Sequence, residues 1–200
     1  PFFAITLTLS SHEPFEIPIA SSFKGNDLPQ LFRKSANYTD QCIQHFMEAA
    51  KKEKWYKNTL FIFVADHGHR LPKEYSTAFD YRKFRIPLIF TGDVIKPAYR
   101  GKRIHLLGSQ TDLAATLLSQ LNINHDQFKW SKDLLNPQSI PFAFYSFDNG
   151  FGWVNTNQTI VQDNINNKIV FNNKPEINPE TNLQKGRAYM QQVFKEYLAY

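Results

Sequence analysis

The stretch FIFVADHGHR, residues 61–70, places a short apolar run directly before a group of polar side chains. The apolar run of residues 59–65 is typical of a buried strand in a sheet that is covered on both faces. Asp66 and His67 follow at the point where this strand ends. In an α/β fold, ligands bind beyond the carboxyl ends of the strands, so both are candidate site residues.

Asp66 and His67 offer a carboxylate oxygen and an imidazole nitrogen, a pair suited to a divalent ion such as Zn²⁺ or Mn²⁺. Adjacent side chains point to opposite faces of a regular strand, so both reach one ion only where the chain leaves the sheet. Gly68 permits such a bend and a close backbone approach. Taken alone, the tripeptide favours a turn capped by Asp66, and two ligands do not complete a metal site.

A second histidine occupies a similar position. Residues 1–9 mix apolar side chains with threonines and predict a strand, and His12 follows it in a proline-containing loop, residues 10–30. If this strand is parallel to residues 59–65, the two carboxyl ends share one edge and His12 faces the other two site residues. The alternative is a surface histidine in a loop.

The remaining pattern predicts an α/β fold. Apolar residues at helical spacing indicate a helix at 31–54 and another at 109–121, which begins with the capping box of Ser109 and Asp112. A further strand is expected at 86–91. We expect a mixed or parallel sheet with the strands 1–9, 59–65 and 86–91 side by side, flanked by those two helices.

The last third of the chain differs from the rest in its pattern of residues. Short β-branched and aromatic segments separated by Asn, Asp and Gly predict a small antiparallel sheet at 141–172. A helix capped by Asn178 follows, with Leu183, Met190, Phe194 and Tyr197 as its buried stripe. The predicted domains are therefore an α/β part, residues 1–139, and a β subdomain with a C-terminal helix, residues 140–200.

Composition narrows the class of protein. The chain has 200 residues, 42% of them hydrophobic, and a net charge of +5, which excludes a disordered chain. The basic residues are dispersed, so we expect no nucleic-acid partner. Cys42 is the single cysteine, which excludes an intramolecular disulfide framework. The chain opens on a predicted core strand without Met, so we expect it to be a piece of a longer protein.

Four stretches in order resemble one family. They are PFFAITLTLSSHEPF (1–15), YTDQCIQHFMEAAKKEKWYKNTLFIFVADHG (38–68), FRIPLIFTG (84–92) and SQTDLAATLLSQL (109–121). Together they resemble the sulfatase family within the alkaline phosphatase superfamily, and most nearly its lipoteichoic acid synthase-like branch of membrane-anchored phosphoglycerol transferases. The resemblance covers roughly residues 1–155 and implies an alkaline phosphatase-like sheet flanked by helices.

The resemblance also implies roles for the site residues. Asp66 and His67 correspond to ligands of the catalytic metal, which would be Mn, Zn, Ca or Mg, and His12 corresponds to the histidine that contacts the phosphate or sulfate group. The family's nucleophile, Thr or formylglycine, and an acidic metal ligand on its first strand have no counterpart in this chain. Cys42 lacks the C-x-P-x-R setting of the modified residue. We therefore assign no catalytic nucleophile here and expect the isolated chain to be inert.

These features lead to one main hypothesis and its rivals. The chain is interpreted as the C-terminal part of an extracytoplasmic, membrane-anchored, metal-dependent sulfatase or phosphoglycerol transferase. Its substrate would be a sulfate or phosphate ester of a glycan or lipid headgroup, and the fragment is expected to self-associate. The alternatives are a phosphodiesterase or phosphoethanolamine transferase of the same superfamily, or a non-catalytic module that binds an anionic glycan or nucleic acid.

Overall fold

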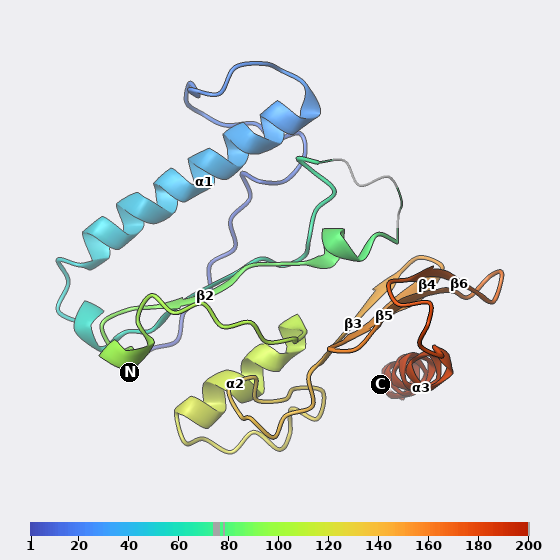
Figure 1. Ribbon diagram of the computed structural model, residues 1–200. Coiled ribbons are helices and arrows are strands. Elements are labelled where there is room, and N and C mark those ends of the chain that lie inside the picture. The colour runs from blue at the N-terminus through green and yellow to red at the C-terminus, as the bar shows by residue number, and fades with distance from the viewer. Residues whose placement is uncertain (74–76, 78, 200) are drawn as a thin grey trace. The chain divides into compact units, whose positions relative to one another are not determined.

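In the computed structural model, which describes residues 1–73, 77 and 79–199, a long helix α1 spans Leu28–Ala50 (Figure 1). Its start is fixed by Asp27, whose Oδ1 accepts a hydrogen bond from the backbone N–H of Gln30 at 2.9 Å. The helix predicted at 31–54 is therefore confirmed, although it begins earlier and ends at Ala50. Residues 51–54, KKEK, lie in the turns that follow it.

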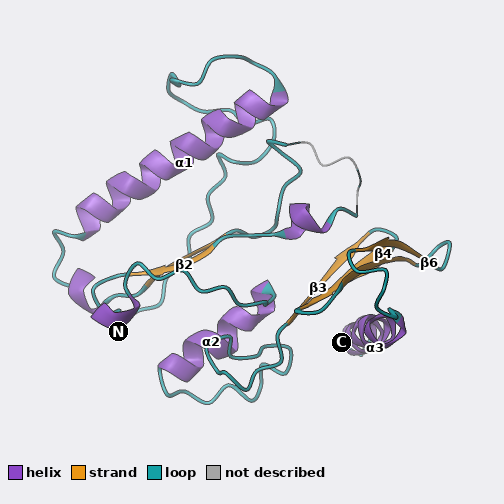
Figure 2. Cartoon of the chain, viewed as in Figure 1, coloured by secondary structure: helices purple, strands orange, loops and turns teal. Residues whose placement is uncertain are grey.

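Strand β1 (Phe61–Val64) pairs with strand β2 (Leu88–Thr91) in a two-stranded sheet (Figure 2). The pairing is antiparallel, with Phe61 opposite Thr91. A small core forms where α1 ends, from the buried residues Ala50, Tyr56 and Phe61 with Met47 and Phe63 packed against them. The strands predicted at 59–65 and 86–91 are thus present and adjacent.

Residues 1–9 do not form the predicted strand. They are exposed throughout, with Phe3 at 81% and Leu9 at 82% exposure. The prediction of three strands side by side, covered on both faces, is wrong for the described residues, and Ile89 in β2 is itself 53% exposed. The reason is that a strand is stabilised by a hydrogen-bonded neighbour and by apolar cover, and no described residue pairs with this segment in a ladder.

Helix α2 (Leu113–Gln120) follows a short 3₁₀ turn, Gln110–Asp112. The predicted capping box is present, because Ser109 accepts from the backbone of Asp112 and donates its own N–H to the Asp112 carboxylate at 2.7 Å. Asp112 is 2% exposed, and Lys132 Nζ donates to its Oδ2 at 2.5 Å. The buried capping residue is therefore also one half of a partly buried ion pair, which the sequence did not predict.

The predicted antiparallel sheet and terminal helix are confirmed. Four strands pair in chain order, and helix α3 (Glu180–Tyr197) follows them. Asn178 Oδ1 accepts from the N–H of Glu180 at 3.0 Å, although Pro179 occupies the cap position itself. The strands are β3 (Phe142–Phe147), β4 (Gly150–Asn155), β5 (Thr159–Asp163) and β6 (Lys168–Asn172).

The core of this sheet lies against α3. Phe151, Trp153 and Ile160 of the sheet are buried with Leu183 of the helix, and Met190 packs beside them. The predicted stripe is wrong for Phe194 and Tyr197, which are 57% and 74% exposed. The buried contact of the helix with the sheet is made by Leu183 near its start, with Met190 beside it, and the last two turns stay more exposed.

The chain divides into two compact units, Pro1–Ser76 with Arg82–Lys102, and Thr77–Tyr81 with Arg103–Tyr200. In the second unit, Phe79 packs on Phe147 of β3, and Tyr81 packs on Phe171 of β6. Residues 103–139 group with the small sheet, while the predicted domain division at 139/140 stays a prediction. None of the helices in the described part of the chain combines the length and apolar character needed to cross a bilayer.

We expect Gly186→Ala to destabilise the second unit. A Cβ at this buried position would lie 2.1 Å from Phe151 Cε2, and that ring is fully buried. Alanine gains about 1 kcal/mol in helix propensity, but overpacking costs about 1–3 kcal/mol, so we expect a net loss of up to about 2 kcal/mol. Urea denaturation followed by circular dichroism measures this, with the exposed Gln191→Ala of the same helix as the control. Equal stability of Gly186→Ala and Gln191→Ala would contradict the packing described.

Candidate functional site

Asp66 and His67 lie in the bend that follows β1, where the chain has left the sheet. The backbone N–H of His67 donates to Asp66 Oδ1 at 2.9 Å, which orients the carboxylate. Asp66 Oδ2 lies 3.6 Å from His67 Nε2. Both side chains are open to solvent, at 76% and 69% exposure. The two neighbouring side chains therefore face one space, as shared binding of an ion requires.

The tautomer of His67 follows from its second nitrogen. Nδ1 lies 2.8 Å from the carbonyl oxygen of Gly68, and because a carbonyl only accepts, Nδ1 carries the hydrogen. In the neutral ring, Nε2 then presents a lone pair towards the Asp66 carboxylate. Their separation of 3.6 Å is shorter than the sum of a Zn–N and a Zn–O distance, about 4 Å, so both atoms can contact one ion.

The donor set of Asp66 and His67 fits a divalent cation but does not complete a site. Structural and catalytic zinc sites use three or four protein ligands. Within the residues that the structure describes, no group of three or more His, Cys, Asp or Glu side chains could hold a metal ion. A complete metal site would need further ligands from outside the residues that the structure describes.

Gly68 holds this bend close to another segment. A Cβ on Gly68 would lie 1.8 Å from the carbonyl oxygen of Lys83 and 3.0 Å from Cα of Phe84. Both neighbours belong to the backbone, so neither moves as cheaply as a side chain. The close backbone approach predicted for Gly68 is therefore confirmed.

His12 lies in a tight turn, in which its N–H donates to the carbonyl of Leu9 at 3.0 Å and its own carbonyl accepts from Phe15 N–H at 2.8 Å. Its Nδ1 lies 2.7 Å from the carbonyl oxygen of Glu13, so this nitrogen also carries the hydrogen. The exposed ring presents Nε2 to the surroundings. His12 and His67 thus share one tautomer, with Nε2 available for a ligand.

The loop of His12 contacts the loop that follows Asp66 and His67, even though residues 1–9 form no strand. The rings of Phe15 and His69 lie 5.8 Å apart, edge to face. Arg70 Nη2 lies 3.6 Å from Glu13 Oε1 in a half-exposed ion pair. The expected proximity of the two loops is therefore present, while the roles of the site residues stay predictions.

His69 is a packing residue of the first unit rather than a solvated loop residue. Its ring stacks on Phe32 of α1 at 5.0 Å, with an angle of 10° between the planes. Its Nδ1 accepts from the backbone N–H of Leu71 at 3.1 Å. Burial lowers the pKa of His69, and Glu13 opposes this only in part. The neutral ring is the form that can accept this hydrogen bond.

Phe15 was missed by the sequence interpretation, although it closes the SSHEPF stretch. It is 2% exposed and its φ is +63°. An apolar aromatic residue directly after a turn-forming Glu-Pro pair was the available signal, because such a residue finds little cover unless the loop folds over it. The burial of Phe15 shows that this loop packs on the body of its unit.

Comparison with known proteins identifies the family. The model of the family described as Sulfatase matches residues 1–123. The chain belongs to the sulfatase family. The match includes His12, Asp66 and His67 and every segment around them described above.

Relatives of this sulfatase-family chain are longer proteins. It is 28% identical over 161 residues to lipoteichoic acid synthase-like YvgJ of Bacillus subtilis (strain 168), which covers 72% of this chain and 26% of the relative. It is 26% identical over 163 residues to lipoteichoic acid synthase 2 of the same organism, covering 71% of this chain and 24% of the relative. The chain therefore spans about a quarter of the length of these relatives.

A solved structure shares the fold. A protein in the alkaline phosphatase superfamily from Vibrio parahaemolyticus superposes with a TM-score of 0.75 at 22% identity, over 96% of this chain and 48% of that one. The expected fold class, an alkaline phosphatase-like α/β part followed by a small antiparallel sheet and a terminal helix, is therefore confirmed.

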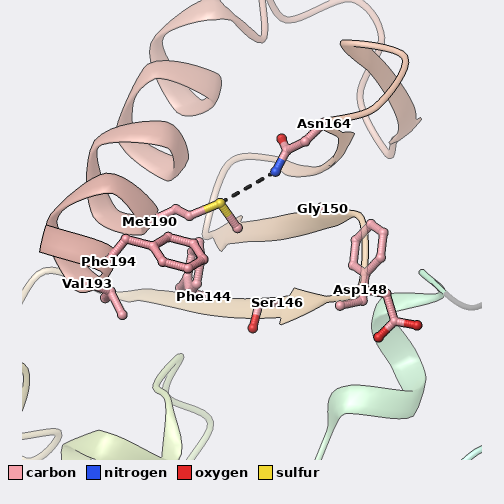
Figure 3. A pocket seen from close by; sticks show the side chains of 9 residues that line it. Phe144, Ser146, Asp148, Gly150, Asn164, Met190, Val193 and Phe194 are labelled. Atoms are coloured by element: carbon pink, nitrogen blue, oxygen red, sulfur yellow. Dashed lines mark hydrogen bonds between the residues drawn. The ribbon is translucent and has the colours of Figure 1, made fainter. Parts of the chain in front are cut away.

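Two recesses in the sulfatase-family chain lack the pair of metal-binding side chains that is found at the end of β1. One, of about 590 Å³, lies between the loop of Phe15 and α1 and includes Lys34. The other, of about 270 Å³, lies in the second unit between β3 and α3, where Phe144, Met190 and Phe194 give it an apolar lining (Figure 3). Asn164 Nδ2 donates to Met190 Sδ across it at 3.5 Å (Figure 3). Neither brings together a carboxylate and an imidazole.

We expect Gly68→Ala to loosen the bend that holds Asp66 and His67. The added methyl group displaces the Lys83 carbonyl, so the free energy of unfolding should fall by about 1–3 kcal/mol. Amide hydrogen exchange should rise in residues 66–71.

Gly101→Ala is the control, because Gly101 has a φ of +69° but open space around its Cβ position. It should cost about 1 kcal/mol through backbone strain and leave exchange at residues 66–71 unchanged. The same exchange at residues 66–71 in both variants would contradict the close approach of Gly68 to Lys83.

Proposed function

We propose that this chain is the C-terminal part of a metal-dependent phosphoglycerol transferase. Asp66 and His67 hold the metal, and His12 contacts the phosphate that is transferred. The observation that carries this proposal is the convergence of Asp66 Oδ2 and His67 Nε2, 3.6 Å apart at the end of β1, next to the loop of His12. The lipoteichoic acid synthases among the relatives support a phosphate-ester substrate rather than a sulfate ester.

The proposed roles use the orientation of each side chain. Asp66 supplies Oδ2, which lies 3.6 Å from His67 Nε2, and His67 supplies Nε2, because its Nδ1–H is bound by the Gly68 carbonyl. When bound there with its remaining ligands, a divalent ion supplies charge neutralisation on the ester oxygens and lowers the pKa of a hydroxyl nucleophile. The protein's part is to hold the two donor atoms rigid at a strand end.

His12 can stabilise the transferring group only as a hydrogen-bond donor, because phosphate oxygens accept. Its Nδ1–H is directed at the Glu13 carbonyl, so the donor is Nε2–H of the protonated ring. A charge-assisted hydrogen bond of this kind strengthens as negative charge grows on the phosphate oxygens. We assign the nucleophile and the remaining metal ligands to the rest of the longer protein, which we propose to be membrane-anchored and extracytoplasmic.

Hydrolysis of a sulfate ester is the second candidate, since the family carries that name and the same donors suit a sulfate group. A phosphodiesterase or phosphoethanolamine transferase would use them in the same way. The nucleophile distinguishes these activities, and no residue of this chain is assigned to it.

The roles of the two histidines can be separated in the full-length protein. We expect His67→Ala to lower both metal content and activity, because losing a ligand weakens the metal site. We expect His12→Ala to keep the metal and lower kcat by on the order of a hundredfold, as for loss of a hydrogen bond in the transition state. Atomic emission measures the metal, and turnover of a phosphodiester substrate measures kcat.

The matched control is His45→Ala, which removes an exposed imidazole of α1 and should change neither quantity. Loss of the metal in His12→Ala as complete as in His67→Ala would make His12 a ligand and contradict the division of roles.

We expect the isolated 200-residue chain to be inert, because it brings together two metal donors and no assigned nucleophile. Nitrophenyl sulfate, phosphate and phosphodiester substrates should remain unchanged with Mn²⁺, Zn²⁺, Mg²⁺ or Ca²⁺. We also expect self-association through the exposed apolar side chains of residues 1–9. Turnover that His67→Ala abolishes would show that the chain holds its own nucleophile.

A further inference from the structure

Phe15 combines full burial with a backbone conformation that bulky residues avoid. It is 2% exposed, and its φ of +63° lies in the left-handed region, where its Cβ approaches the following carbonyl. Such strain persists only where surrounding contacts outweigh it, and it is concentrated near functional sites. The contacts of Phe15 therefore indicate which interactions maintain this strained conformation.

The ring of Phe15 joins three segments of the first unit. It meets Phe32 of α1 edge to face at 5.6 Å and His69 edge to face at 5.8 Å. Phe32 and His69 are stacked on each other at 5.0 Å, which closes the cluster. The loop of His12, the helix and the loop after β1 thus meet around the buried ring of Phe15.

We propose that Phe15 is a positioning residue, which fixes His12 relative to Asp66 and His67. This inference rests on the roles proposed above for those three residues. His12 is three residues from Phe15 and is joined to it by the hydrogen bond from Phe15 N–H to the His12 carbonyl, 2.8 Å long. His67 is two residues from His69, so the cluster lies a short length of chain from both imidazoles.

The other contacts described for the loop of His12 are weaker than this cluster. The Glu13–Arg70 pair is 3.6 Å long and about half exposed at both ends, so solvent and salt screen it. The hydroxyls of Ser11 and Thr39, 3.1 Å apart, tie the loop of His12 to α1 but not to the loop after β1. The three packed rings, with Phe15 buried among them, therefore set the spacing between the loops.

The test uses the full-length protein and begins with Phe15→Ala. Displacement of His12 by about 1 Å should lower kcat on the order of ten- to a hundredfold, with metal content and KM unchanged. Tyr56→Ala is the matched control, because it removes another buried aromatic residue of the same unit, which packs in the separate core of Ala50 and Phe61. It should lower Tm while leaving kcat unchanged. Equal kcat in the two variants would overturn the proposal.

A double-mutant cycle shows whether Phe15 acts through His12. If it does, Phe15→Ala should cause no further loss of kcat once His12→Ala is present. The same factor lost in both backgrounds would overturn the proposal even if kcat falls. Should Phe15→Ala not fold, the comparison is made with Phe15→Leu, which keeps apolar volume but loses the edge-to-face contacts.

Amide hydrogen exchange provides a readout that is independent of activity. Phe15→Ala should speed exchange in residues 66–71, about fifty positions along the chain, and Tyr56→Ala should not. Unchanged exchange of residues 66–71 in Phe15→Ala would contradict the proposal that the Phe15 ring links the two loops. The proposed function fails separately, if His67→Ala keeps its metal or His12→Ala keeps its kcat.

Discussion

The packing of Phe15 between Phe32 and His69 brings two loops, far apart in the chain, to one place. Each loop has its own local order: the first is closed by backbone hydrogen bonds around His12, and the second by the approach of Gly68 to the Lys83 carbonyl. Neither local arrangement fixes one loop relative to the other. Packing of the three rings, with Phe15 buried among them, does so, and its dispersion and apolar burial outweigh the strained backbone at Phe15.

The candidate site could be predicted where its signal is local. An apolar run that ends in Asp66 and His67 indicates a strand end, and the structure has that bend at the same residues. The capping box of Ser109 and Asp112 was likewise readable, because both partners lie within one helical turn. The antiparallel order of β3 to β6 follows from short turns between neighbouring strands.

Features that depend on distant partners could not be predicted in this way. Residues 1–9 have a strand-like pattern, yet a pattern does not reveal whether a neighbour is present to pair with them. The partly buried pair of Asp112 and Lys132 spans twenty positions, and nothing in the sequence joins those two charges. Phe15 belongs to the same class, since its partners are in a helix and in a loop far along the chain.

The division of the chain into units limits how it can be cut. Residues 77–81 belong to the second unit, whereas residues 82–102 return to the first. A single cleavage therefore cannot release either unit intact. A truncated chain that ends at Lys102 would carry Phe79 and Tyr81 without their partners, and one that starts at Arg103 would leave Phe147 and Phe171 without theirs. A segment that keeps all residues of either unit therefore has to include parts of the other.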